Sequence, residues 1–185
     1  MIENWTDIDG WFSEHDAEIY NMIVDRYTNA KFIEIGVWKG RSFASVIDKL
    51  LKNNYNEIYV ADHWLGAPTE RTTSQIEVSV SDIFDIFSTN LKELGFNGKY
   101  NPLKMDSISA SKQFADEYFD VIFIDGDHEY ESVKEDLLKW YPKLKIGGTI
   151  CGHDKDYPPV EKALKEVFNL DFKSIKGNIW YCGKP

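Results

Sequence analysis

The chain has 185 residues, 43% of them hydrophobic and 28% charged, so it is long enough to bury a sizeable core without disulfides, and we expect residues 1–185 to form a single domain. Its 31 Asp and Glu against 21 Lys and Arg give a net charge of −10. That excess of acid argues against nucleic acid as a partner, because such binding needs a basic surface.

The apolar runs are all short. Val121–Ile124 is one of the longest, far from the roughly 20 residues that cross a bilayer, so we expect no membrane span. Residues 1–10 have no basic region followed by an apolar run, which predicts no secretory signal and a cytoplasmic protein. Cys151 and Cys182 lie in apolar runs, and we expect buried, reduced thiols.

From about residue 14 the sequence alternates between short β-rich runs and amphipathic helical stretches, a pattern typical of a parallel sheet with helices on both faces. An N-terminal helical segment, residues 1–29, would precede a core of residues 30–185. The first half predicts a helix at Glu14–Tyr27, a strand at Lys31–Ile35, a helix with Phe43, Val46, Ile47, Leu50 and Leu51 on one face, a strand at Ile58–Ala61 and a polar loop from about Leu65 to Gln75.

In the second half, apolar residues recur at helical spacing between Ile76 and Leu94, and Gly95 stands where a helix C-terminal cap is expected. Pro102 favours an entry or edge position for a strand at Tyr100–Met105. The remaining expected elements are a strand at Val121–Ile124, a helix from Val133 to Tyr141, a turn at Gly147-Gly148 into a strand at Thr149–Gly152, a helix opened by Pro158-Pro159, and strands at Phe172–Lys176 and Ile179–Cys182 around a two-residue turn at Gly177-Asn178. The expected fold is therefore α/β and doubly wound, with a seven-stranded, mostly parallel sheet that ends in an antiparallel hairpin.

Ligands of an open parallel sheet collect at the carboxyl ends of its strands, so the residues that follow each strand are candidates for chemistry. The first strand runs into Glu34-Ile-Gly36-Val-Trp-Lys-Gly40-Arg-Ser42, where two glycines let a turn approach a ligand and the next helix offers N–H groups to an anion. A tight turn with no ligand explains the same glycines equally well.

The second and third strands also end in acids. Asp62, followed by His63, can accept two hydrogen bonds from a ribose diol, although a loop or cap acid is the plainer reading. Asp106, followed by Ser107, can bind an adenine amino group or cap the next helix.

Two polar clusters, residues 125–130 and 152–156, follow the fourth and fifth strands. Acids and histidines brought together there would repel one another unless a positive charge lies among them. An oxygen-rich set of Asp125 and Asp154 with His153 nearby suits Mg²⁺ or Mn²⁺ better than zinc. A solvated acidic rim with hydrogen-bonded histidines is the alternative.

These residues resemble the class I S-adenosylmethionine-dependent methyltransferases, which have a Rossmann-like fold. Within them the segment Phe123–Leu137, with Asp-Gly-Asp-His-x-Tyr, is similar to a subgroup that includes macrolide sugar O-methyltransferases and cephalosporin hydroxylase-associated proteins. The likeness extends from about Phe32 to the carboxyl terminus. The resemblance implies that the cofactor is bound by Glu34, Gly36, Gly40, Ser42, Asp62, His63, Asp106, Ser107 and Asp125.

The same resemblance implies a metal held by Asp125, His153 and Asp154, with Asp125 and His128 catalytic and His128 the base that takes a hydroxyl proton. His153 departs from the pattern, because those relatives have a carboxylate there. Lys155 also departs, standing where catechol O-methyltransferases have an amide, and its ammonium could pair with the acids in place of a metal.

The function that the resemblance implies is methyl transfer to a small-molecule hydroxyl, on a sugar or a phenol, with assistance from Mg²⁺ or Mn²⁺. Acceptor walls are expected from the loop at 65–75 and from Trp5, Trp11 and Phe12, with core packing as the alternative for these aromatics. A metal-dependent phosphohydrolase and a non-catalytic nucleoside-binding protein are the competing functions. Self-association into a homo-oligomer is compatible with the sequence.

Overall fold

The structure of the chain, a computed structural model, describes residues 2–66, 83–169, 172–174 and 177–185. Its strands are β1 (Lys31–Ile35), β2 (Glu57–Asp62), β3 (Asn101–Lys104), β4 (Phe119–Ile124), β5 (Leu144–Gly152), β6 (Lys173–Ser174) and β7 (Trp180–Gly183). Its helices are α1 (Glu14–Val24), α2 (Arg41–Lys52), α3 (Ile83–Glu93), α4 (Ser107–Ser111), α5 (Tyr130–Trp140) and α6 (Pro158–Phe168), with 3₁₀ turns at Trp5–Asp7 and Tyr141–Lys143.

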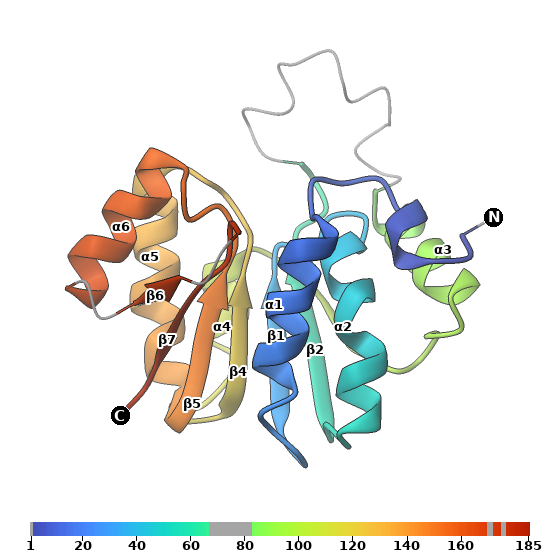
Figure 1. Ribbon diagram of the computed structural model, residues 1–185, viewed down its shortest axis with the longest axis horizontal. Coiled ribbons are helices and arrows are strands. Elements are labelled where there is room, and N and C mark those ends of the chain that lie inside the picture. Colours follow the sequence, from blue (N-terminus) through green and yellow to red (C-terminus); the bar gives the residue numbers. More distant parts are fainter. Residues whose placement is uncertain (1, 67–82, 170–171, 175–176) are drawn as a thin grey trace.

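The strands form one sheet in the order β3-β2-β1-β4-β5-β7-β6 (Figure 1). The strands β1 to β5 are parallel, β7 pairs antiparallel with β5, and the two-residue β6 adds a short antiparallel edge. The predicted α/β fold with a mostly parallel sheet and an antiparallel C-terminal pair is confirmed. Because strand order reverses between β1 and β4, the crevice beside their carboxyl ends is where this fold binds ligands.

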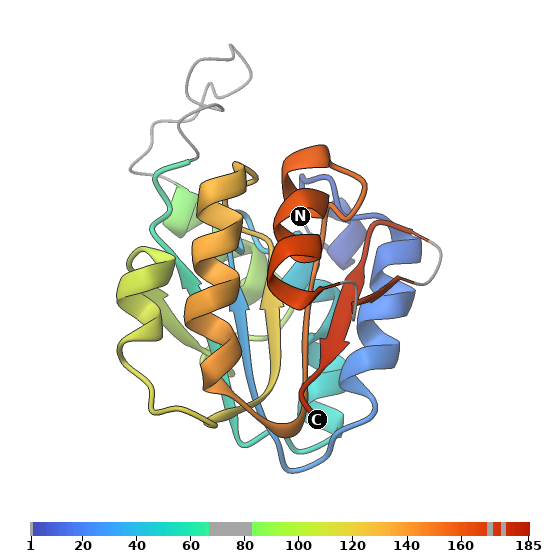
Figure 2. The same cartoon turned by 90° about the vertical axis from the view of Figure 1, so that its left-hand side faces the viewer.

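Helices cover both faces of the sheet, as Figures 1 and 2 show. Successive strand residues point to opposite faces, so Phe32 of β1 joins the core under α1, α2 and α3, while Ile33 joins the core under α4, α5 and α6. Both side chains are fully buried. This burial on both faces explains why the central strands are apolar throughout.

Three local sequence signals act as predicted. Gly95 ends α3 with φ of +83°, and the N–H groups of Gly95 and Phe96 donate to the carbonyls of Lys92 (3.0 Å) and Leu91 (2.8 Å), which is a Schellman motif. Pro102 lies in β3, at the sheet edge. Pro158 is the first residue of α6. Ile76 and Val80, predicted in the same helix as Leu91, lie outside the described residues, as do residues 67–75 of the predicted loop.

Two boundaries differ from prediction, and each lies beside a long-range contact. The first helix ends at Val24 rather than Tyr27, and the Tyr27 hydroxyl donates instead to the carbonyl of Gly147 (3.1 Å) on β5. The Gly147-Gly148 pair lies inside β5 and not in a turn before it. A Cβ on Gly148 would lie 2.9 Å from the carbonyl oxygen of Asp120, so close pairing with β4 requires glycine there.

The C-terminal hairpin also differs from prediction. A two-residue turn at Gly177-Asn178 would pair Ser174 with Tyr181, whereas Ser174 pairs with Trp180. Asn178 is bound elsewhere, because its N–H donates to Asp16 (3.1 Å) and its side-chain amide to Asp154 (3.2 Å). These two bonds fix Asn178, which precedes β7, at the carboxyl ends of the parallel strands.

Cys151 and Cys182 are both buried thiols, as predicted. Among the described residues, none of the helices combines the length and the apolar character that a bilayer span requires.

Gly36 and Gly95 allow a test of how closely β1 and β4 approach. Both have φ near +80°, but a Cβ on Gly36 would overlap the backbone carbonyl of Asp125, whereas nothing lies within 4 Å of one on Gly95. Gly95→Ala should lower the free energy of unfolding by about 1 kcal/mol, the cost of the left-handed conformation. Gly36→Ala should lower it by roughly 3 kcal/mol or more, because overlap is added. Urea denaturation measures both, and equal losses would contradict this account.

Candidate functional site

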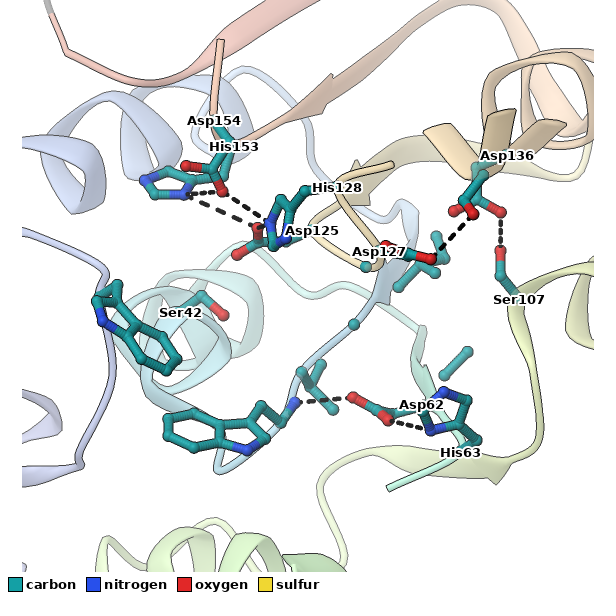
Figure 3. A pocket seen from close by; sticks show the side chains of 18 of the residues that line it. Ser42, Asp62, His63, Ser107, Asp125, Asp127, His128, Asp136, His153 and Asp154 are labelled. Atoms are coloured by element: carbon teal, nitrogen blue, oxygen red, sulfur yellow. Dashed lines mark hydrogen bonds and ion pairs between the residues drawn. The ribbon is translucent and has the colours of Figure 1, made fainter. Parts of the chain in front are cut away.

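A cavity of about 1000 Å³ lies at the carboxyl ends of the parallel strands (Figure 3). It brings together residues that follow β1, β2, β3, β4 and β5, as expected of the point where strand order reverses. The predicted site residues that line it are Gly36, Ser42, Asp62, His63, Asp106, Ser107, Asp125, His128, His153 and Asp154. Glu34 and Gly40 are not among the lining residues.

Glu34 does not line the cavity, but it is hydrogen-bonded to Ser42, which does. Its carboxyl group is fully buried and accepts hydrogen bonds from the hydroxyls of Tyr20 (2.8 Å) and Ser42. Burial raises the pKa of Glu34 to about 8. The acid therefore connects α1, β1 and α2 through hydrogen bonds rather than facing a ligand.

The two predicted glycines serve the packing of the chain itself. Gly36 allows the turn after β1 to touch the backbone of Asp125, and it also lines the cavity. Gly40 is the N-cap of α2 with φ of 93°, where a Cβ would lie 2.6 Å from Leu91 on α3. Both glycines therefore allow a close contact. At Gly36 the contact is with the backbone after β4, and at Gly40 it is with side chains of α3.

Asp62 is held by the backbone on both sides. Its carboxylate accepts the N–H of Trp38 (2.9 Å) and of Trp64 (2.6 Å). Its side chain is 13% exposed, and the His63 ring nitrogen Nδ1 lies 3.6 Å from it. Each carboxylate oxygen has two lone pairs, so the group remains able to accept hydrogen bonds from a ligand in the cavity.

Asp106 caps α4, since its side chain accepts the N–H of Ser109 (2.8 Å), which bears out the capping alternative while leaving Asp106 at the cavity wall. The hydroxyl of Ser107 donates to Asp136 and accepts the indole N–H of Trp140 (2.8 Å). Burial raises the pKa of Asp136 to about 7. Sequence analysis gave Asp136 no role, although it lies in the motif that carries the resemblance.

Asp125, His128 and Asp154 converge after β4 and β5, as Figure 3 shows. The His128 nitrogen Nε2 lies 2.8 Å from Asp154 and 3.7 Å from Asp125. Potential ligand atoms of these three residues all lie within 4.8 Å of one another. Asp154 has φ of +58°, a conformation uncommon outside glycine, which aims its carboxylate at both histidines.

His153 is buried and has a different position from the one predicted for a metal ligand. Its Nδ1 lies 3.1 Å from Asp154 and its Nε2 lies 3.3 Å from Asp16 of α1. Both ring nitrogens thus face carboxylates of the protein. Asp16 was missed by sequence analysis, because Ser13 and Asp16 form the capping box of α1 and nothing local indicates a second role.

The acids and imidazoles of this cluster stabilise one another. The neighbouring carboxylates of Asp125 and Asp154 raise the pKa of His128 to about 10. Burial opposes the charge on His153, but Asp154 and Asp16 outweigh it and raise its pKa to about 10. Burial also opposes ionisation of Asp154, yet the two imidazoles hold its pKa below the usual range. In the protein alone, the histidines supply the positive charge.

Some of the residues expected to form the walls of the acceptor site do line the cavity. Trp11 and Phe12 line the cavity, whereas Trp5 does not, and packs instead beside the Arg41 guanidinium. Gly66 lines it too, and residues 67–75 lie outside the described chain. Lys155 does not pair with the acids of the cavity, because its ammonium lies 2.6 Å from the exposed Asp156.

Comparisons with known proteins give a consistent result. A family model described as a methyltransferase domain matches residues 33–155. No curated protein sequence matches the chain. The solved structure of the O-methyltransferase NovP is 18% identical, with a TM-score of 0.67 over 91% of this chain and 78% of its own. An O-methyltransferase from Bacillus cereus in complex with SAH is 16% identical, with a TM-score of 0.65 over 97% of this chain and 86% of its own. CalS11, a calicheamicin methyltransferase, is 16% identical, with a TM-score of 0.62 over 93% of this chain and 80% of its own.

The buried acid Glu34 generates a prediction about pH. The folded protein keeps a proton on Glu34 up to a pKa of about 8, whereas the unfolded chain releases it near 4.5. The free energy of unfolding should therefore fall as pH rises between these values. Glu34→Gln, which has no charge to bury, should lack this decrease, so it should gain stability relative to the parent protein from pH 5 to pH 8. Thermal or urea unfolding measures the trend, with the exposed Asp48→Asn on α2 as control. Parallel pH curves for Glu34→Gln and the parent would contradict it.

Proposed function

The chain belongs to the methyltransferase domain family and is an S-adenosylmethionine-dependent methyltransferase, and from this premise we propose that it methylates a hydroxyl oxygen of a small molecule, a sugar or a phenol. The observation that carries the proposal is that Asp62 and the cluster of Asp125, His128 and Asp154 open into one cavity. A nucleoside bound at Asp62 and an acceptor hydroxyl bound at the cluster would meet in this cavity.

The described residues fit the cofactor in space and in hydrogen-bonding capacity. Asp62 would accept the ribose hydroxyls, beside His63. Asp106 and Ser107 line the wall on which the adenine would lie, and Gly36 and Ser42 line the part beside Asp125 that would hold the methionine group. Glu34 and Gly40 do not line the cavity and would act indirectly, by fixing the turn between β1 and α2.

When bound, S-adenosylmethionine supplies a methyl group on a positively charged sulfur. The work of the protein is then to align the acceptor oxygen with that methyl and to take the hydroxyl proton. We assign the proton to His128 in its neutral form, because its ring lines the cavity with 40% of the side chain exposed while Asp154 and Asp125 orient it. In the protein alone these two carboxylates raise the pKa of His128 to about 10, so the imidazolium must first lose its proton before it can act as a base. Both orienting carboxylates would also stabilise the imidazolium that forms.

We further propose that Asp125 and Asp154 hold Mg²⁺ or Mn²⁺. The oxygen donors suit these cations, which proteins often bind through one or two carboxylates. His153 leaves the proposed ligand set, since both of its nitrogens face carboxylates. A bound cation would lower the pKa of the acceptor hydroxyl and supply positive charge to the two carboxylates, and so reduce their hold on the His128 proton.

Asp62 tests the cofactor site. Asp62→Asn removes the charge that strengthens hydrogen bonds to the ribose, and should weaken binding of S-adenosylmethionine by on the order of a hundredfold. Isothermal titration calorimetry measures the affinity, and circular dichroism checks that the turns at Trp38 and Trp64 remain folded. Glu129→Gln, an exposed acid lining the same cavity, is the matched control and should bind like the parent. Unchanged affinity in Asp62→Asn would remove the proposed nucleoside position.

Asp154 tests the cation. EDTA should lower the turnover of S-adenosylmethionine with a hydroxyl acceptor, and Mg²⁺ should restore it. Asp154→Asn should reduce turnover at saturating Mg²⁺ by on the order of a hundredfold, because several kcal/mol of charge stabilisation depend on the ligand. Asp156→Asn changes an acid two residues away that is 74% exposed, and should respond to Mg²⁺ like the parent. Equal turnover with and without EDTA would exclude the metal and leave the methyl transfer standing.

A further inference from the structure

Trp11 is exposed in a way that the fold does not require. It is 71% exposed, the largest fraction among the exposed large apolar side chains of the described chain, yet it lines the cavity. Its ring stacks on that of Trp38, with centroids 5.0 Å apart and an angle of 25° between the planes. An exposed aromatic face beside a cavity is a surface on which the face of another ring can stack.

The segment that carries Trp11 is fixed in place. Arg41, the first residue of α2, donates hydrogen bonds to the carbonyls of Thr6 (2.6 Å), Ile8 (2.5 Å) and Phe12 (2.7 Å). These carbonyls flank Trp11 on both sides along the chain. The aromatic face is therefore pre-organised, which reduces the entropy that a ligand must lose when it binds there.

Aromatic rings also adjoin His128 and its neighbour His153. Phe12, next to Trp11, has its ring centroid 5.2 Å from that of His153. Tyr157 is 46% exposed, lines the cavity and meets the His128 ring edge-on at 6.3 Å. A ring that stacks on Trp11 or Tyr157 would lie in the cavity that His128 and Asp154 also line, so its hydroxyl group could reach them.

The charge of the residues that line the cavity limits the charge that an acceptor ring can carry. Nine of the described lining residues are Asp or Glu and two are Lys or Arg. Lys39 is engaged by Asp9 at 2.7 Å and lies over the Trp38 ring, and Arg41 is engaged by the three carbonyls. Each lining histidine has a carboxylate within 3.6 Å. Even with the cofactor's single net positive charge and a divalent cation, acid remains in excess.

We propose that the methyl acceptor is a hydroxylated ring compound without negative charge, and that Trp11 and Tyr157 bind the face of its ring beside His128. The proposal rests on the proposed function and narrows its substrate class. Among the described residues that line the cavity, none offers a free cation to a phosphate or carboxylate of the acceptor. Like charge in the cavity would repel such a group, whereas a neutral or cationic ring meets no such penalty.

Two probe sets, matched in ring and hydroxyl pattern and differing in charge, test the class. Catechol, dopamine and protocatechuate form the phenol set, and methyl rhamnoside and TDP-rhamnose form the sugar set. Calorimetry on the protein saturated with S-adenosylhomocysteine and Mg²⁺ gives affinities, and mass spectrometry detects methylated product with S-adenosylmethionine. In the set that binds, we expect the neutral or cationic members to bind at least about tenfold more tightly than the anion. Equal or tighter binding of either anion would overturn the proposal.

The outcomes distinguish failure of the proposed acceptor class from failure of the proposed methyl transfer. Binding of S-adenosylhomocysteine without binding of any neutral or cationic probe would overturn the acceptor class and leave the proposed function. Probe binding with the expected preference but no methylated product would overturn the hydroxyl methylation and leave the ring preference. Failure to bind S-adenosylhomocysteine would overturn both.

Variants test the two aromatic side chains. Trp11→Ala and Tyr157→Ala should each weaken binding of the preferred probe by about threefold to tenfold, the scale of one aromatic contact, without changing the affinity for S-adenosylhomocysteine. Trp11→Phe should restore most of the loss. Ile146→Ala removes an apolar side chain on β5 that is 69% exposed and outside the cavity lining, and should have no effect. Parent-like probe affinity in both alanine variants would overturn the assignment of Trp11 and Tyr157.

Discussion

The site depends on the mutual compensation of carboxylates and imidazoles at the strand ends. Asp154 binds His128 and His153, and His153 reaches Asp16, so the chain of contacts runs from the turn after β4 to α1. Asp16 and His153 are buried, and buried charges are costly unless they are paired. The pairing therefore fixes where the first helix lies against the sheet, and Asn178 draws the C-terminal hairpin into the same network through Asp16 and Asp154.

Backbone packing complements this charge network. Gly36 lets the turn after β1 touch the carbonyl of Asp125, which brings the proposed cofactor side and the acid cluster to the same crevice. Glu34, beneath that turn, connects Tyr20 of α1 with Ser42 of α2. The elements around the cavity are thus fixed by close backbone contact and buried hydrogen bonds. Trp11, by contrast, lines the cavity and is exposed to solvent.

Sequence periodicity was sufficient for much of the fold and for the edge at which the site lies. Lys31–Ile35 has the predicted bounds, and the polar residues that follow the strands do meet in one cavity. What sequence could not supply were partners distant in the chain. Tyr27 was predicted in the first helix, but it lies beyond the helix end and its hydroxyl bonds to β5. Asp16 has the sequence context of a helix cap, and its contact with His153 is visible only in the structure. The choice between His128 and His153 depends on such partners too, since both follow strands and only their neighbours differ.

In the proposed account, the cofactor of this methyltransferase lies between Asp62 and Asp125, and its reactive methyl group points toward His128. A crystal structure with S-adenosylhomocysteine tests this placement most directly. The account predicts density with the ribose hydroxyls within hydrogen-bonding distance of Asp62 and the sulfur facing Asp125 and His128. A nucleoside bound outside this cavity, or one whose sulfur points away from His128, would contradict it.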